Sequence, residues 1–278
     1  METKATCNSD FLFDAGLDHA LYFERWAPLM EAILSKGCDV YIDEDWGTAF
    51  GHEGSVLHHE TTLPFKELKD FLIVVLPRMV SSPDFMCSGR AVPAHCLCID
   101  MRDGESKEIT CEGENVTVAY ADSPQGYQAF WRTMIDAYAN DHHEFDLHVD
   151  QAFWQLELGP AARNGWGSTG HAFANIKRCL VQHLAYLNDE VIDDWAEARY
   201  QDPAFSARAQ AKGVLLSRDE SAAGARRYED GSGALQPCRH HTKLSPQGHA
   251  VSPHHGGRIY FAVENREIVL VGKVCEHD

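Results

Sequence analysis

Basic and imidazole side chains alternate along a short segment near the end of the chain. If residues 238–244 form a strand, Arg239, His241 and Lys243 share one face, and His240 lies on the other. An imidazole with a pKa near neutrality can act as a general base or acid, and neighbouring cations can stabilise a phosphorane. These residue types suit cleavage of RNA through attack of its own 2′-hydroxyl, which needs a base, an acid and cations but no metal ion.

A second predicted strand, at residues 258–263, adds to this set. Its alternation places Arg258 and Tyr260 on one face and Ile259 and Phe261 on the other. We expect the polar pair to lie on a half-exposed face and the apolar pair to lie in the core.

The predicted RNA-cleaving site gives each residue type a role. His241 is the expected base or acid. The expected phosphate stabilisers are Arg239, Lys243 and Arg258, and the expected auxiliary residues are Tyr260 and His277. The prediction requires these side chains to converge in the folded protein.

A metal site is the alternative interpretation of the same segment. Soft and borderline ligands follow one another closely, and the candidate set is Cys238, His240, His249 and His254. Zinc accepts such ligands, although the spacing fits no standard zinc finger. Under this interpretation the segment is structural and the protein is a zinc-stabilised interaction module without enzymatic activity.

The net charge of −18 is distributed unevenly along the chain. Residues 1–150 contain 27 Asp and Glu but only 10 Lys and Arg, whereas residues 213–278 contain 8 of each and six histidines. The C-terminal part is therefore the one that could approach a polyanion such as RNA.

Composition also bears on the compartment. The first residues, METKATCNSD, do not form a signal peptide, and no apolar run approaches the 18 residues of a membrane-spanning helix. Nine scattered cysteines are an odd number at low density, unlike a disulfide framework. We expect a cytoplasmic protein with reduced thiols and no membrane association.

Short apolar runs alternate with helical patterns in the first half of the chain, which predicts an α/β domain with a parallel sheet. The predicted strands are 10–13, 38–42, 71–76, 95–100 and 115–120, and the predicted helices are 20–34, 63–70 and 125–138.

The pattern changes after a polar segment at residues 140–150, which predicts a domain boundary there. We expect domains at 1–142 and 148–278, the second an α+β domain with a small antiparallel sheet. Its predicted strands are 152–158, 238–244, 258–263 and 268–274, and its predicted helices are 173–187, 192–199 and a stretch ending at residue 212.

The order of elements over residues 8–140, with GCDVY at 37–41 and SSPDFMC at 81–87, resembles the Toll/interleukin-receptor (TIR) domain. The resemblance implies a flavodoxin-like sheet. In the TIR enzymes that cleave NAD, a glutamate occupies the position that the resemblance matches to Arg90 of this chain. A guanidinium cannot stabilise a developing cation, so a sensing or binding role is expected, unless Glu53 or Glu60 substitutes.

Residues 150–278, through the GRIYF strand at 257–261 and the terminal segment 271–278, resemble the RelE and HigB superfamily of bacterial ribosome-dependent ribonuclease toxins. The resemblance implies an α+β domain that acts on RNA or the ribosome, with an antitoxin or another protein as a possible partner. A bacterial toxin or antiphage-defence protein is therefore the expected function. The alternatives are a nucleotide-binding or NAD-consuming TIR protein and the zinc-stabilised interaction module; the oligomeric state stays open.

Overall fold

The computed structural model describes the backbone of residues 4–7, 19–36, 40–43, 80–82, 96–99, 107–111, 114–121, 123–218, 226–245, 256–264 and 268–276. Within these ranges, no helix is both long and apolar enough to cross a membrane.

Contacts along the backbone divide the chain into two compact units, Met1–Phe130 and Trp131–Asp278. The division falls inside helix α5 (Pro124–Tyr138), earlier in the chain than the predicted boundary at 140–150. The independent folding of domains at 1–142 and 148–278 stays a prediction.

A mixed, mainly parallel sheet organises unit 1. Its strand order is β3-β2-β1-β4-β6-β5. The neighbours are parallel except β5 and β6, which form an antiparallel pair at one edge. The elements before α5 are β1 (Lys4–Cys7), α1 (His19–Ser35), β2 (Val40–Asp43), β3 (Val80–Ser82), β4 (Cys96–Ile99), β5 (Lys107–Cys111) and β6 (Glu114–Ala121). An α/β arrangement with parallel strand pairs is thus present.

Several predicted elements of unit 1 agree with the structure. The predicted helices at 20–34 and 125–138 correspond to α1 and α5, and the predicted strand at 95–100 contains β4. The sheet also contains β1 and β5, which the sequence patterns did not predict. The predicted strands at 10–13 and 71–76 and the helix at 63–70 lie outside the described residues.

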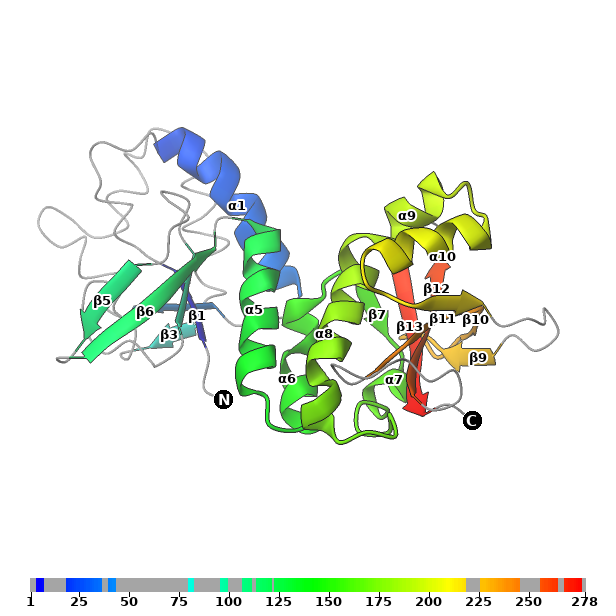
Figure 1. Ribbon diagram of the computed structural model, residues 1–278. Helices are drawn as coiled ribbons and strands as arrows, with labels where there is room; N and C mark the ends of the chain where they lie inside the picture. Colours follow the sequence, from blue (N-terminus) through cyan, green and yellow to red (C-terminus); the bar gives the residue numbers. More distant parts are fainter. Residues whose placement is uncertain are drawn as a thin grey trace, which may run out of the picture. The chain divides into compact units, whose positions relative to one another are not determined.

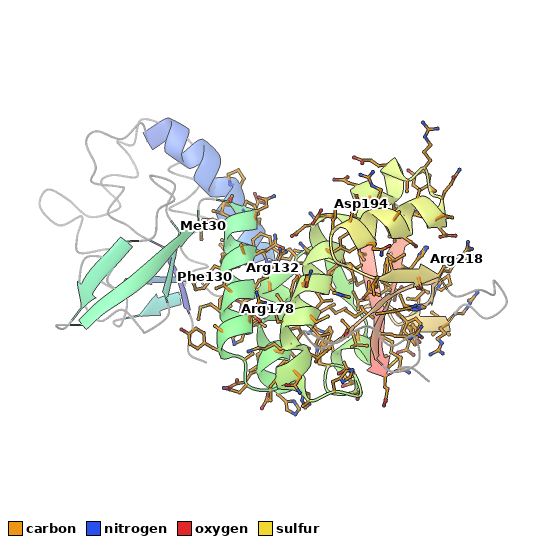
Figure 2. All side chains as sticks on the ribbon, in the orientation of Figure 1. Met30, Phe130, Arg132, Arg178, Asp194 and Arg218 are labelled. Atoms are coloured by element: carbon orange, nitrogen blue, oxygen red, sulfur yellow. The ribbon has the colours of Figure 1, made fainter. Side chains whose placement is uncertain are left out.

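Unit 2 combines five helices of the described residues that follow α5 with a mainly antiparallel sheet. Its helices are α6 (His142–Ala152), α7 (Pro160–Arg163), α8 (Phe173–Asp189), α9 (Val191–Glu197) and α10 (Asp202–Ala211). Arg132, in the middle of α5 and labelled in Figure 2, connects this helix to α8, because its Nη2 donates to Asp189 Oδ1 at 2.9 Å.

Helix α6 occupies the segment predicted to be a polar boundary. The Asp141 carboxylate caps it, accepting hydrogen bonds from the backbone N–H groups of His143 and Glu144 at 2.9 Å each. Phe145 and Val149 on its inner side are fully buried. The segment looks polar because most of an amphipathic helix faces water, and its few apolar positions were too sparse to be recognised.

Five strands form the main sheet of unit 2, in the order β7-β13-β12-β11-β8. All neighbouring strands are antiparallel except β7, which is parallel to β13. The strands are β7 (Leu156–Leu158), β8 (Leu216–Arg218), β11 (His240–Lys243), β12 (Gly257–Glu264) and β13 (Ile268–Glu276). The strands predicted near the C-terminal end are confirmed, whereas the strand predicted at 152–158 is limited to β7.

A separate hairpin, β9 (Arg226–Glu229) and β10 (Leu235–Cys238), lies on one face of this sheet, while α8, α9 and α10 lie toward the other (Figure 1). Gly272 on β13 permits the close approach, since a Cβ atom there would lie 2.6 Å from Cys238 Sγ and 2.7 Å from Tyr228 Cδ2. We call these two surfaces the hairpin-side face and the helix-side face.

Candidate functional site

The side chains of two adjacent histidines on strand β11 lie on opposite faces of the sheet. The His240 ring lies on the helix-side face, with its centroid 5.6 Å from that of Phe261 and 5.5 Å from that of Phe205. The His241 ring lies on the hairpin-side face, 5.2 Å from the Tyr260 ring. The period of two that the sequence predicted for this segment is therefore present.

Polar groups on the helix-side face have partners within the fold. His240 Nε2 donates to Asp202 Oδ1 at 2.9 Å. Thr242 Oγ1 and His183 Nδ1 are hydrogen-bonded at 2.9 Å. Burial lowers the pKa of His183 to about 4, so this ring is neutral at physiological pH.

On the hairpin-side face, a guanidinium lies directly against His241. Arg258 Nη1 donates to His241 Nε2, and the two atoms are 2.5 Å apart. Cross-strand pairing opposes His241 to Tyr260 and Lys243 to Arg258, so all four side chains belong to one face. We call the set formed by His241, Lys243, Arg258, Tyr260 and the neighbouring Arg226 the cationic cluster.

The hairpin supplies side chains that sequence reasoning missed. The Arg226 guanidinium carbon lies 4.9 Å from the centroid of the Tyr260 ring. The Tyr228 ring centroid lies 5.9 Å from the same Tyr260 centroid. On β13, Lys273 pairs in register with Tyr260, and its Nζ lies 6.0 Å from the Tyr228 ring centroid. The position of Lys273 could have been predicted from the alternation of side chains along β13. The position of Arg226 over the Tyr260 ring could not, because it depends on how the hairpin packs on the sheet.

The electrostatic environment of His241 is strongly positive. Burial is the largest cause that lowers its pKa, followed by the charges of Arg258, Lys243 and Arg226, and together they lower it to about 3. His241 is therefore neutral at physiological pH. Burial also raises the pKa of Tyr228 to about 12, although Arg226 partly offsets this, so the phenol keeps its proton.

The cationic cluster is more buried than its sequence suggested. Arg258 was expected on a half-exposed face with Tyr260, yet their exposed fractions are 9% and 2%, and that of His241 is 3%. The expectation was wrong because the β9–β10 hairpin covers this face. Ile259 and Phe261 are fully buried, as expected for the core.

The structure brings together four of the six predicted site residues: His241, Lys243, Arg258 and Tyr260. Arg239 does not join them, because it lies between β10 and β11 and is exposed. His277 lies outside the described residues.

The candidate zinc ligands are not brought together as far as the structure describes them. Cys238 packs on the hairpin-side face with Tyr260, Leu270 and Cys275, whereas His240 lies on the helix-side face. His249 and His254 lie outside the described residues. Among the described residues, no three His, Cys, Asp or Glu side chains are placed to hold a metal ion.

In unit 1 the residues that bear on NAD chemistry, Arg90, Glu53 and Glu60, all lie outside the described residues. The chain matches no protein-family model, no curated protein and no solved structure. The functional argument therefore depends on the geometry of unit 2.

Proposed function

We propose that unit 2 binds RNA at the cationic cluster and cleaves it without a metal ion. The observation that carries the proposal is the convergence of His241, Arg258, Lys243 and Arg226 on one face of the sheet. Like charges that lie close together and partly out of water repel one another, so the buried Arg258 beside the half-buried Lys243 and Arg226 lowers the stability of the free protein. A phosphodiester anion that approaches the cluster at the half-buried Lys243 and Arg226 would compensate the charge.

In this proposal His241 is the general base. An imidazole that is neutral at physiological pH can accept the proton of a ribose 2′-hydroxyl. Its pKa of about 3 makes it a weak base in the free protein. A bound phosphate would offset the repulsion from the surrounding cations and raise that pKa toward the range in which general bases are efficient.

Arg258 has a role both before and after the substrate binds. In the free protein its guanidinium donates to His241 Nε2 and so occupies the lone pair that the base needs. A phosphate oxygen is a stronger acceptor for a guanidinium than a neutral imidazole. Binding would draw Arg258 onto the phosphate, release His241 Nε2, and leave Lys243 and Arg226 to share the developing charge.

The proposed reaction is an internal transesterification. The 2′-oxygen loses its proton to His241 and bonds to phosphorus, and the bond from phosphorus to the 5′-oxygen breaks. The departing 5′-oxygen takes a proton from an acid, for which the protonated phenol of Tyr228 is available. The products are a 2′,3′-cyclic phosphate and a 5′-hydroxyl end.

For the whole chain we propose a bacterial toxin or antiphage-defence protein. The acidic charge of residues 1–150 argues against direct contact between unit 1 and RNA, so unit 1 is proposed as a TIR-like sensing or interaction domain. The nearly balanced charge of the C-terminal part, together with the cationic cluster, supports RNA as the ligand of unit 2.

The test is cleavage of single-stranded RNA by the full-length protein in excess EDTA, with product ends identified by mass spectrometry. We expect cyclic phosphate ends and a rate 10²- to 10⁴-fold lower for His241→Gln. His143→Gln is the matched control, because His143 is an exposed histidine on α6. An activity that EDTA abolishes, or that survives His241→Gln, would contradict the proposal.

A growth assay extends the test to the proposed biological role. Expression of the full-length chain in bacteria should arrest growth, and His241→Gln should relieve the arrest at equal protein level. If the His241→Gln variant is equally toxic, the toxicity does not come from RNA cleavage by His241. RNA binding without cleavage would leave unit 2 as a binding module only.

A further inference from the structure

A pocket of about 300 Å³ lies in unit 2 beside the beginning of β11. It is lined by Trp195, Gln236, Pro237, Arg239, His240, Ala262 and Val263. These residues come from α9, from the end of β10 and the start of β11, and from the second half of β12. The volume is at the lower end of the range for small-molecule sites.

One wall of the pocket is a rigid aromatic group. The Trp195 ring centroid lies 4.9 Å from that of Phe205 and 5.3 Å from that of His240. His240 is in turn fixed by its 2.9 Å hydrogen bond to Asp202. Asp202 also forms an ion pair with Arg218, which lies at the end of β8; Arg218 is labelled in Figure 2. The aromatic wall is therefore held in place before any ligand arrives.

The polar groups around the pocket keep free hydrogen-bonding capacity. Arg239 makes no ion pair or hydrogen bond within the described part of the chain, and its guanidinium is exposed. Asp202 occupies His240 Nε2, which leaves Nδ1 as the ring nitrogen open to a ligand. Gln236 uses its Nε2 on Asp230 Oδ2, at 3.0 Å, and keeps its carbonyl oxygen as an acceptor.

We propose that this pocket binds a nucleobase, stacked on Trp195, with the attached phosphate on Arg239. Planar bases stack on aromatic side chains and are hydrogen-bonded along their edges when RNA is single-stranded. The imidazole nitrogen and the amide oxygen offer contacts to such an edge. A guanidinium next to the opening suits a phosphate oxygen.

The position of the pocket relative to the cationic cluster supports this ligand. Ala262 follows Tyr260 by two residues on β12 and lies on the same side of the strand. Two residues of a strand span about 7 Å. Because the pocket lies where β11 begins, it is lined both by His240 of the helix-side face and by Ala262 of the hairpin-side face, so a nucleotide stacked on Trp195 would have to pass around this end of β11 to place its next phosphate in the cationic cluster. This step rests on the proposed RNA cleavage, for which the pocket would select one base.

The experiment measures binding of AMP, GMP, CMP and UMP to the full-length protein by calorimetry, with inorganic phosphate as the reference. We expect at least one nucleotide to bind more tightly than phosphate. Arg239→Ala should weaken it at least tenfold, and Trp195→Ala about 5- to 150-fold. Arg178→Ala, an exposed arginine on α8 (Figure 2), should bind as the wild type does.

Trp195 has packing contacts, so Trp195→Phe is the second variant if Trp195→Ala lowers the melting temperature; it should retain part of the affinity. With RNA, Arg239→Ala should raise KM and leave kcat unchanged, whereas His241→Gln should lower kcat. Nucleotide binding without RNA cleavage would keep the pocket and reject the proposed function. RNA cleavage with nucleotide affinity equal to that of phosphate, or unaffected by Arg239→Ala, would reject the pocket.

Discussion

On the two faces of the five-stranded sheet in unit 2, adjacent histidines have partners of opposite charge. On the helix-side face, His240 is bound to the carboxylate of Asp202. On the hairpin-side face, His241 is bound to the guanidinium of Arg258, and the charged groups that shift its pKa most are all cations. The first arrangement stabilises the folded protein, whereas the second opposes it.

This difference distinguishes structural polar groups from candidate functional ones. Natural sequences keep like charges close together at partly buried positions where a function requires them, at a cost in stability. A histidine paired with a carboxylate in an aromatic environment needs no ligand to explain it. A histidine surrounded by cations needs a ligand to explain it, and an anion is the ligand that would remove the repulsion.

Among the changes that compare the two faces, removal of a cation from the hairpin-side face should have the largest effect on cleavage. Arg258→Met keeps an unbranched chain in the buried position but deletes the charge, so RNA cleavage should fall by about 10²- to 10³-fold. The deleted charge repelled its neighbours, but its loss also removes the donor of the hydrogen bond to the buried His241 Nε2, so the two effects oppose each other and the melting temperature should change little. A loss of activity accompanied by a large loss of stability would show that Arg258 is a structural residue.

The opposite behaviour is expected on the helix-side face. Thr242→Val preserves side-chain shape but leaves buried His183 without its hydroxyl partner, which should lower the free energy of unfolding by about 1–3 kcal/mol. Cleavage by the folded protein should be unchanged. Urea unfolding measures the free energy of unfolding, and initial rates at urea concentrations below the unfolding transition measure cleavage by the folded protein. A fall in kcat would mean that the two faces do not differ in function.

A pH series sharpens the comparison further. The pKa of His241 is about 3 in the folded protein and near 6.5 when unfolded, so between these values the unfolded chain binds a proton that the folded chain excludes. This residue therefore lowers stability as the pH falls from about 6.5 toward 3, by at most about 1.4 kcal/mol per pH unit.

His241→Gln removes this titration. The stability of the variant relative to the wild type should increase as urea unfolding is moved from pH 7.5 to pH 5. A difference that does not change with pH would mean that His241 is not held neutral by its surroundings.

The smallest expected effect is the response to a simple anion. Sulfate should occupy the cationic cluster and stabilise the folded protein by about 1 kcal/mol when it is present at a few times its Kd. Sulfate also stabilises proteins in general, so the measurement is the difference in melting temperature shift between the wild type and Arg258→Met. Equal shifts would argue against an anion site.

Local sequence patterns were sufficient for several parts of unit 2. The period of two correctly separated His240 from His241 and placed Arg258 with Tyr260, because alternation is a property of a single strand. Helical periodicity likewise located α8, since apolar residues recur along it on one side. These results needed no knowledge of what packs against each element.

The tertiary structure decided which groups meet and which are covered. Cys238 and His240 are close in sequence but separated by the sheet, and Arg226 reaches Tyr260 only because Gly272 lets the hairpin lie on β13. The burial of His241, which is the largest cause of its lowered pKa and therefore of its neutral state, also depends on tertiary packing. The sequence by itself determined the faces on which the side chains lie, because backbone alternation is local. It could not determine their partners, because these come from distant segments whose docking depends on the whole core.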